Sequence, residues 1–306
     1  RYGAIGLSFS HFLIKRYKGA ESRVWLVPLF AIAYALSGML VSYQMNVIFY
    51  DAMIMLPLVI VYLEEILDGG RPYRYAFILG LTVFLQFYMG YMISIFIVLY
   101  SCYYVSPRLS IQGTLKQKLK HFLNPLVKTF AFSVIGVATA SVLIVPVFYN
   151  LLESKGQVGD AMKFSLAFQI NPVDILSKLA IGGFDTASGW SAGPNLPNIY
   201  IGALGFLGFI LYFTSKKIAK EKRWAAGAVT FVFFLSFVNE FVSKIWHMGQ
   251  NPAGFFFRFS WLFSFFMLVL AYQVVKGQVE ISRRGKLLSA VLLVLSAIYL
   301  YTKKFT

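Results

Sequence analysis

Positive charge is gathered into a few short segments of this chain of 306 residues, and long apolar stretches lie between them. Of the 28 Lys and Arg residues, 19 fall in five such segments. Multi-spanning membrane proteins carry Lys and Arg in this way in their short cytoplasmic loops. The pattern therefore predicts a membrane-spanning chain and the side of the membrane on which each loop lies. The five segments are 15–23, 71–74, 108–120, 216–223 and 276–286.

Composition supports the same class of protein. Hydrophobic residues make up 58% of the chain and charged residues 13%, and the mean hydropathy is +0.69. Such a chain is solvated mainly by lipid, so we expect one membrane domain over 1–306, where a soluble chain of this length would form two. The net charge of +16 is confined to alternate loops. This indicates orientation in a membrane and contact with anionic lipid head groups, and it argues against nucleic acid as a partner.

The apolar stretches have the length of membrane spans. A bilayer core about 30 Å thick needs about 20 apolar residues per helix. We predict an all-α polytopic transmembrane bundle with eight or nine whole spans and one incomplete span. Because the chain starts and ends within apolar segments, we expect it to be a piece of a longer protein. The predicted passes are 2–14 (incomplete), 24–40, 50–63, two within 75–105, 125–148, 199–213, 224–237, 255–275 and 287–301.

The run 75–105 requires a choice between one span and two. One straight helix would exceed the membrane thickness and would place the basic segment 108–120 on the outer side. Sidedness therefore favours two short passes with a break near 86–91. We expect Gly90 to supply the turn. One long tilted helix is the alternative.

The only long outer segment is predicted at 149–198. It holds several turn-forming glycines and prolines, and Asp185 lies in its Gly-rich part. Within it, 171–181 begins with Asn-Pro-Val-Asp and continues with spaced Ile and Leu, which is typical of a short amphipathic helix at the membrane interface. Half of the 12 acids of the chain lie in outer segments. We therefore expect the functional site to face outward.

Arg258 is the first candidate site residue. It lies a few residues inside an aromatic, apolar span. A charge at membrane depth costs a few kcal/mol on insertion scales, about 3, so such residues are usually paired or functional. A planar guanidinium can hold two phosphate oxygens at once, which makes a lipid phosphate a natural ligand. The alternatives are an arginine that extends to the outer interface, or one paired with Glu240 or Asp51.

Two carboxylates at outer ends of spans are the candidate catalytic residues. Asp51 opens a span shortly after Gln44 and Asn46, which are candidate substrate-binding residues. Its carboxylate can accept a proton from a sugar or polyol hydroxyl, or it can complement the dipole of its own helix. Glu240 precedes Arg258 by 18 positions. It is either a second acid of the same outward cavity or an ion-pair partner of Arg258 or Lys244.

The remaining candidates bind substrate. His247 precedes the Arg258 segment and can face the same site, although a lone interfacial histidine is more often structural. Asp185 belongs to a stretch that can fold over the site, although loop acids are more often solvated. The sequence shows no HxxxH or CxxC spacing, glycine-rich phosphate loop or Ser-His-Asp set. Nothing therefore indicates a metal site, a cofactor or a soluble-type hydrolase. A single cysteine, Cys102, excludes an intrachain disulfide.

Five stretches, in this order, together resemble the YfhO family of bacterial membrane proteins. The resemblance covers roughly residues 20 to 275. The five family segments are Ala-Tyr-Ala-Leu-Ser-Gly at 33–38, the stretch 46–58 with Asn46, Asp51 and Leu-Pro-Leu, Phe-Tyr-Met-Gly-Tyr-Met at 87–92, Gly-Pro-Asn-Leu-Pro-Asn-Ile-Tyr at 193–200 and Arg-Phe-Ser-Trp-Leu-Phe at 258–263.

The resemblance implies an activity. The family is similar to membrane glycosyltransferases that use polyprenyl-phosphate sugars. This implies a lipid-linked sugar donor and a cell-wall or envelope glycopolymer, such as a teichoic acid, as the acceptor, on the outer face of the bacterial cytoplasmic membrane. In such enzymes the base is an acid of the first outer loop, which would precede Arg1. The alternatives are a transporter or flippase of a lipid-linked or anionic substrate, whose polar residues should lie near the midplane, and a non-catalytic assembly subunit.

Overall fold

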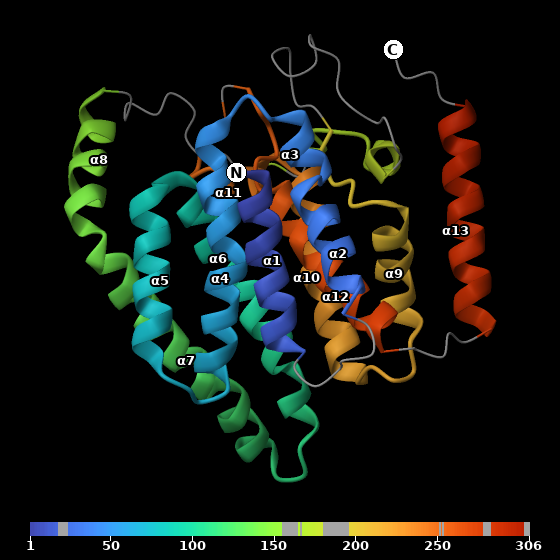
Figure 1. Ribbon diagram of the computed structural model, residues 1–306, viewed down its shortest axis with the longest axis horizontal. Coiled ribbons are helices and arrows are strands. Elements are labelled where there is room, and N and C mark those ends of the chain that lie inside the picture. Colours follow the sequence, from blue (N-terminus) through green and yellow to red (C-terminus); the bar gives the residue numbers. More distant parts are fainter. Residues whose placement is uncertain are drawn as a thin grey trace.

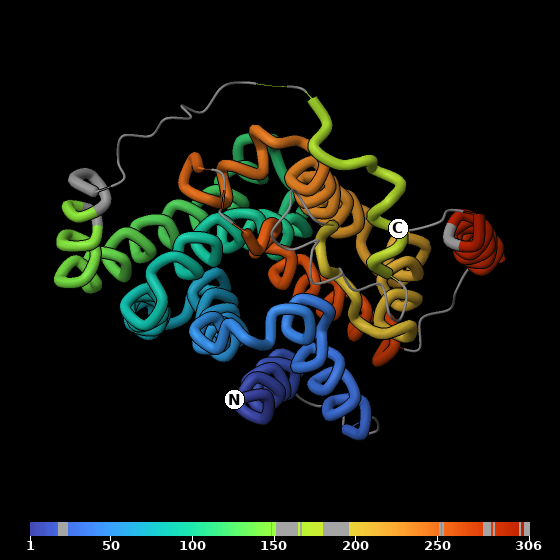
Figure 2. Tube along the Cα trace, turned by 90° about the horizontal axis from the view of Figure 1, so that it is seen from above, coloured from blue at the N-terminus to red at the C-terminus, as the bar shows by residue number. Residues whose placement is uncertain are grey.

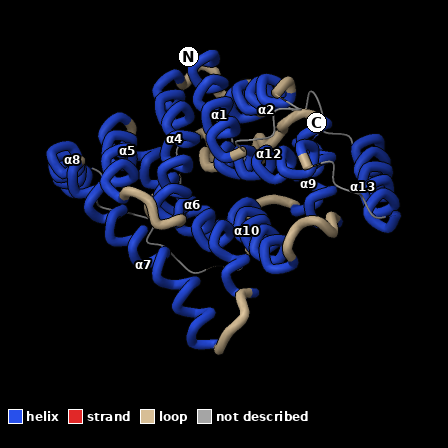
Figure 3. The backbone as a smooth tube through the Cα atoms, turned by 60° about the horizontal axis from the view of Figure 1, so that its bottom comes forward, coloured by secondary structure: helices blue, strands red, loops and turns tan. Residues whose placement is uncertain are grey.

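The structure is a computed structural model that describes residues 1–17, 24–154, 165, 167–179, 196–250, 252, 254–277 and 283–302. Within these ranges the chain is almost entirely helical (Figure 3), and an isolated bridge pairs Phe168 with Asn239. The all-α prediction is confirmed. The helices are α1 (Tyr2–Arg16), α2 (Leu26–Ala35), α3 (Gly38–Ser42), η2 (Val47–Phe49), α4 (Tyr50–Leu67), α5 (Pro72–Leu85), α6 (Phe87–Val105), η3 (Ser106–Ser110), α7 (Leu115–Thr139), α8 (Ser141–Ser154), η4 (Pro172–Leu179), α9 (Ala203–Thr214), α10 (Lys220–Val238), α11 (Glu240–Trp246), α12 (Ser260–Lys276) and α13 (Arg283–Thr302).

The helices form a bundle with two chemically different ends. The turns that follow α4, α6 and α9 lie together at the lower end in Figure 1, and the described basic segments fall there. We call this the basic end. The turns that join α3 to α4, α5 to α6 and α10 to α12 lie at the other end, which we call the opposite end. The described helices thus connect the two ends as the alternation of basic loops predicts.

Helix α12 lies in the middle of the bundle, as the view from above shows (Figure 2). Nearly every residue of Ser260–Lys276 is buried. Aromatic rings connect it to the helices around it: Phe265 packs edge-on against Phe9 of α1, at 5.5 Å between centroids, and against Phe96 of α6, at 6.0 Å. A helix that is apolar all round is buried on every side, so α12 is the centre of the core.

The described helices differ in whether they can cross a membrane alone. By length and composition, three are long and apolar enough, Val47–Leu67, Phe87–Ser110 and Leu115–Thr139, and five more are apolar but shorter. The predicted span 24–40 is two pieces, because the backbone is extended at Ser37 and separates α2 from α3. Gly38 then approaches Tyr200 so closely that a Cβ there would lie 2.9 Å from the Tyr200 nitrogen.

The run 75–105 is two helices, as sidedness predicted. The break falls at Gln86, whose φ of −151° and ψ of 86° end α5 and start α6. The expectation that Gly90 supplies the turn is wrong. Gly90 lies inside α6, where a Cβ would be 3.0 Å from the Cα of Val83 on α5. Gly90 therefore allows α6 to pack closely against α5 just beyond the break at Gln86.

Helix α7 starts earlier than predicted and stands at the edge of the bundle. It begins at Leu115, inside the basic segment, because Thr114 and Gln117 form a capping box that satisfies its first backbone N–H groups. Only 11% of its most apolar stretch is buried inside the protein, so most of the helix faces outward from the bundle. It meets α5 where Gly80 and Gly136 touch, since a Cβ on Gly80 would lie 2.6 Å from the Gly136 oxygen. Small residues allow such close crossings between membrane helices.

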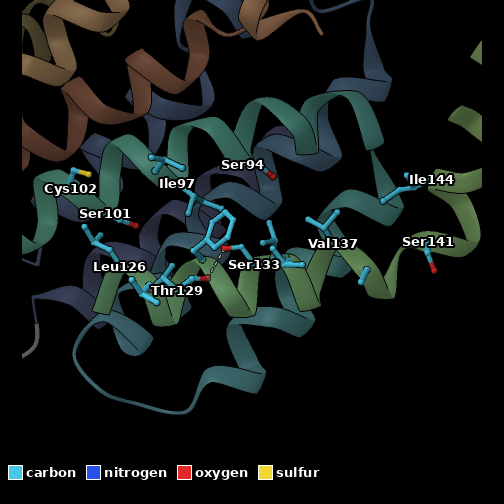
Figure 4. Close-up of a pocket in the computed structure, with 16 residues that line it drawn as sticks. Ser94, Ile97, Ser101, Cys102, Leu126, Thr129, Ser133, Val137, Ser141 and Ile144 are labelled. Atoms are coloured by element: carbon cyan, nitrogen blue, oxygen red, sulfur yellow. Dashed lines mark hydrogen bonds between the residues drawn. The ribbon is translucent and has the colours of Figure 1, made fainter. Parts of the chain in front are cut away.

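An apolar groove remains between α6 and α7. It encloses about 740 Å³ and is lined along α6 by residues from Ser94 to Cys102 and along α7 by residues from Leu126 to Ala138. Figure 4 shows these two rows of side chains facing each other, with the Ser133 hydroxyl bonded to the Thr129 carbonyl at 2.8 Å. That hydroxyl also bonds to Tyr75 at 2.7 Å, so the groove presents almost only carbon.

Two helices stand at the periphery, α8 at one side and α13 at the other (Figures 1 and 3). The predicted span 125–148 is divided at Ala140 between α7 and α8, and α8 continues to Ser154, into the predicted outer loop 149–198. The amphipathic helix predicted at 171–181 is present as the 3-10 helix η4, Pro172–Leu179. It is joined to α13 by a bond from the Tyr299 hydroxyl to Asp174.

Candidate functional site

The segments that carry the family resemblance come together at the opposite end. The Gly38 nitrogen donates to the Tyr200 carbonyl at 2.7 Å, which joins the first segment to the described part of the fourth. The Ser260 hydroxyl donates to the Asn198 carbonyl at 3.4 Å, which joins the fourth to the fifth. Positions more than 200 residues apart therefore border one region. No periodicity in the sequence predicts this convergence.

Arg258 lies where the second, third and fifth segments meet. Its Nε donates to the Phe255 carbonyl at 3.2 Å and its Nη2 to the Gly254 carbonyl at 3.1 Å. Its guanidinium lies 5.1 Å from the ring centroid of Tyr88 on α6 and 5.8 Å from that of Phe49 before α4. Carbonyl dipoles and ring faces both attract a cation. No carboxylate of a described residue lies within ion-pair distance of Arg258.

The backbone before Arg258 is strained. Met248, Phe255 and Phe257 have φ values of 58°, 49° and 56°, in the left-handed region that bulky residues rarely adopt. Contacts with Tyr43, which directly follows α3, hold this conformation: the Tyr43 hydroxyl donates to the Phe256 carbonyl at 3.2 Å, and the Tyr43 ring packs edge-on against Phe255. Such conformations cost about 1–3 kcal/mol each and gather at functional sites.

His247 joins the same cluster through Tyr88. The Tyr88 hydroxyl and His247 Nδ1 are 2.5 Å apart, and the two rings stack. His247 lies in the turn after α11, is only 3% exposed and has a buried Nε2 with no hydrogen-bond partner among the described residues. Burial, together with the nearby Arg258 guanidinium, lowers the pKa of His247 to about 3. The imidazole is therefore neutral at neutral pH. We call Phe49, Tyr88, His247 and Arg258 the Arg258 cluster.

Asp51 lies beside this cluster but faces another cation. It occupies the first turn of α4, two residues after Phe49, and its carboxylate is 3.8 Å from the Arg1 guanidinium. The Asp51 side chain is 39% exposed, so it is accessible to a substrate. Its position also suits the helix dipole, and the structure is compatible with both sequence interpretations.

The two polar residues before Asp51 differ in their surroundings. Gln44 is exposed, and its backbone carbonyl accepts a hydrogen bond from the Tyr50 hydroxyl at 3.0 Å. Asn46 has a buried side-chain nitrogen without a hydrogen-bond partner among the described residues. Of these two candidates, Asn46 is therefore the one with an unused donor.

Glu240 belongs to a neighbouring pocket. Its carboxylate is 2.8 Å from Lys244, one turn along α11, so the Lys244 pairing is the one that the structure has. With Phe256 and Phe257 it lines a pocket of about 490 Å³, and neither Asp51 nor Arg258 is among the lining residues described. The described pocket at Glu240 is thus lined by Phe256 and Phe257 of the strained segment, and the prediction that Glu240 shares a cavity with Asp51 and Arg258 stays a prediction. Asp185 lies outside the described residues.

The other charged cluster was not predicted as a site. At the basic end, Arg16 of α1 forms a buried ion pair with Glu64 of α4, and Tyr100 of α6 donates to the same carboxylate at 2.5 Å. Sequence reasoning assigned Arg16 and Glu64 to loops, although both lie inside helices. Within the described ranges, no group of three or more His, Cys, Asp and Glu residues has a geometry for a metal ion.

The comparisons with known proteins identify a family. The family described as bacterial membrane protein YfhO matches residues 1–306, the whole of the chain. No curated protein and no solved structure matches it. The match agrees with the apolar helices, with the alternation of basic loops and with the resembling segments that meet at the opposite end. The chain is an integral membrane protein and belongs to the YfhO family of bacterial membrane proteins.

Proposed function

We propose that this protein is a membrane glycosyltransferase that transfers a sugar from a polyprenyl-phosphate donor to a cell-wall or envelope glycopolymer, such as a teichoic acid. The reaction would take place at the opposite end of the bundle, on the outer face of the cytoplasmic membrane. In such a transfer the acceptor hydroxyl loses a proton and attacks the sugar, and the polyprenyl phosphate leaves. The protein must therefore supply a base and stabilise the charge that develops on the phosphate.

The surroundings of Arg258 are the observation that carries this proposal. Its guanidinium is held by two backbone carbonyls and two aromatic rings, and no described carboxylate neutralises it. A cation kept in position without a counter-ion is prepared to bind an anion. Asp51 starts a helix two residues after Phe49 and can position the acceptor, or the base that the family resemblance places before Arg1.

The groove between α6 and α7 supports a lipid-linked donor. It begins at Ser94, six residues along α6 from Tyr88, which is about 9 Å of helix. An apolar chain in the groove would bring its phosphate towards the Arg258 cluster. A lipid-linked donor carries its sugar without a nucleotide. This suits a reaction on the outer face of the membrane, where nucleotide sugars are absent.

Binding of polyprenyl phosphate, without a sugar, tests the role of Arg258. We expect Arg258→Ala to weaken binding by roughly tenfold or more, because a charge-assisted bond to a phosphate is lost. Arg258→Lys should be intermediate, since it keeps the charge but loses the two-pronged geometry. Lys120→Ala, which removes an exposed cation at the basic end, is the matched control. Equal binding by Arg258→Ala and wild type would refute the phosphate contact.

Sugar transfer in membranes with equal amounts of each variant tests Asp51. We expect Asp51→Asn to reduce turnover while polyprenyl phosphate still binds, because the amide removes the charge without disturbing the phosphate contact. Wild-type turnover, or loss of donor binding, would contradict this role. If wild-type protein moves the lipid-linked donor across vesicle membranes but incorporates no sugar into polymer, the transporter alternative replaces the transferase.

A further inference from the structure

A small polar pocket lies at the basic end, far from the Arg258 cluster. It encloses about 340 Å³, and the ends of six helical elements contribute to it: α1, α4, α6, η3, α10 and α12. The lining residues include three cations, and Asp68 is the acid among them. They are Arg16, Tyr17, Asp68, Tyr104, Pro107, Arg108, Lys222 and Gln273.

Two of the three cations are neutralised within the protein. Arg16 pairs with Glu64, and both side chains are about nine-tenths buried. Arg108 lies 3.1 Å from Asp68, and it also donates to the Leu67 carbonyl at 2.7 Å. The two pairs fix α1, α4 and α6 around the pocket, and their charges cancel.

Lys222 is the cation that remains. Among the described residues it has no carboxylate within ion-pair distance, and its ammonium lies 5.4 Å from the ring centroid of Tyr103. The Tyr17 hydroxyl, on the same pocket, is buried and has no hydrogen-bond partner among the described residues. Lys276 adds charge nearby, because its ammonium is 4.5 Å from the Tyr17 ring and donates to the Tyr17 carbonyl at 2.8 Å. A pocket with surplus positive charge and an unused hydroxyl donor is complementary to an oxyanion.

An apolar groove adjoins this pocket. It encloses about 740 Å³ between α6, α7 and α10. Tyr103 connects the two spaces, since its ring lines the groove and also lies beneath Lys222. Trp224 and Phe122 continue the apolar wall. The cationic pocket is complementary to the phosphate of an anionic phospholipid, and the apolar groove beside it is complementary to one of the acyl chains of that lipid.

We propose that the basic-end pocket binds the phosphate of an anionic phospholipid from the membrane leaflet at that end, with Lys222 and the Tyr17 hydroxyl as the free donors and an acyl chain in the groove beside Tyr103. The proposal does not depend on the glycosyltransferase activity, because it concerns the other end of the bundle. The same phosphate chemistry is available to inorganic phosphate, which has no chain for the groove. The two sources are therefore separable by experiment.

Native mass spectrometry of the delipidated full chain in neutral detergent tests the proposal with three probes: phosphatidylglycerol, phosphatidylcholine and inorganic phosphate. We expect wild-type protein to bind phosphatidylglycerol roughly tenfold more tightly than phosphatidylcholine. Both lipids carry a phosphate, but the choline cation of phosphatidylcholine offsets that charge and is repelled by Lys222. Lys222→Gln should remove this preference, and Lys222→Arg should keep most of it. Lys120→Gln, which removes an exposed cation from the same end, should leave the preference within about twofold of wild type.

Each outcome has a defined meaning. If wild-type protein binds the two lipids with equal affinity, the proposal is wrong. This test uses no variant, so it does not depend on whether Lys222→Gln folds. An unchanged preference in Lys222→Gln would also overturn it. If inorganic phosphate binds and depends on Lys222 while phosphatidylglycerol shows no advantage, the oxyanion site stands and the lipid source is wrong.

Discussion

Each end of the bundle places one arginine among aromatic rings, and the two arginines differ in what neutralises them. Arg16 forms a buried ion pair with Glu64 and a hydrogen bond with the Tyr100 hydroxyl. Arg258 has two carbonyls and two rings. At Arg16 the positive charge is neutralised by a carboxylate of the protein. At Arg258 no described carboxylate neutralises the positive charge, so an anionic ligand can do so. The comparison indicates that Arg16 is structural and that Arg258 is available to a ligand.

The largest effect is expected from breaking the balanced pair. Glu64→Ala leaves the Arg16 charge buried without its carboxylate, which should lower the free energy of unfolding by about 3–5 kcal/mol. Asp51→Ala is the control, because its pair with Arg1 is 3.8 Å long and about half exposed and should contribute less than about 1 kcal/mol. Denaturant unfolding in detergent micelles measures both. Similar losses in the two variants would mean that burial of the ion pair does not matter.

The next effect separates the two arginines directly. Arg258→Ala should lower the free energy of unfolding by only about 1–2 kcal/mol, because it removes hydrogen bonds but leaves no carboxylate unpaired. The same unfolding experiment measures it. A loss as large as that of Glu64→Ala would show that Arg258 is also structural, and the contrast between the ends would fail.

Acid should weaken the opposite end through His247. Its pKa is about 3 in the folded protein and about 6.5 in the unfolded chain, so the unfolded chain binds the extra proton first. The stability that comes from the neutral imidazole is complete above about pH 6.5, decreases below it, and is lost on the way to pH 3. At pH 5.5 the loss should be about 1.4 kcal/mol. His247→Gln should flatten this part of the profile, and parallel profiles for variant and wild type would contradict the assignment.

The smallest effect concerns backbone strain. Among the described residues, the left-handed positions of the basic-end turns are Gly69 and Gly113, whereas the opposite end places Met248, Phe255 and Phe257 in this region. Met248→Gly should raise the free energy of unfolding by about 0.5–1 kcal/mol. As the matched control, Gly69→Ala should lower it by about 1 kcal/mol, since its Cβ would meet nothing within 4 Å and only the backbone cost remains. Thermal unfolding of both variants measures these changes. If Met248→Gly is less stable than wild type, the packing of the Met248 side chain contributes more than the backbone strain costs.

Much of the fold follows from two patterns in the sequence, the apolar runs and the basic segments between them. They predict the helices, the break within 75–105 and the end at which each turn lies. They do not predict which side chain on a helix faces the bundle, so the pairing of Arg16 with Glu64, 48 positions apart, does not follow from them. A local signal was available for the early start of α7, because Thr114 and Gln117 have the spacing of a capping box.

The candidate site was only partly predictable for the same reason. Arg258 was identified because a cation in an aromatic span is unusual. Its neighbours Phe49 and Tyr88 look like ordinary interfacial aromatics in the sequence, and only the tertiary structure brings them together. The backbone strain around Phe255 and Phe257 has no sequence signal, since phenylalanine does not favour a positive φ.

The crossing of α5 and α7 limits how this sequence can drift over time. At Gly80 a Cβ would meet the Thr139 hydroxyl and, at 2.6 Å, the Gly136 carbonyl oxygen, and at Gly136 a Cβ would lie 2.6 Å from the Ala76 carbonyl oxygen. Where two side chains collide, a second mutation can shrink the other one and restore the fit. A carbonyl oxygen cannot be made smaller by mutation. A smaller residue at Thr139 would therefore remove only one of the two obstacles at Gly80, and a larger side chain at either glycine requires α5 and α7 to move apart.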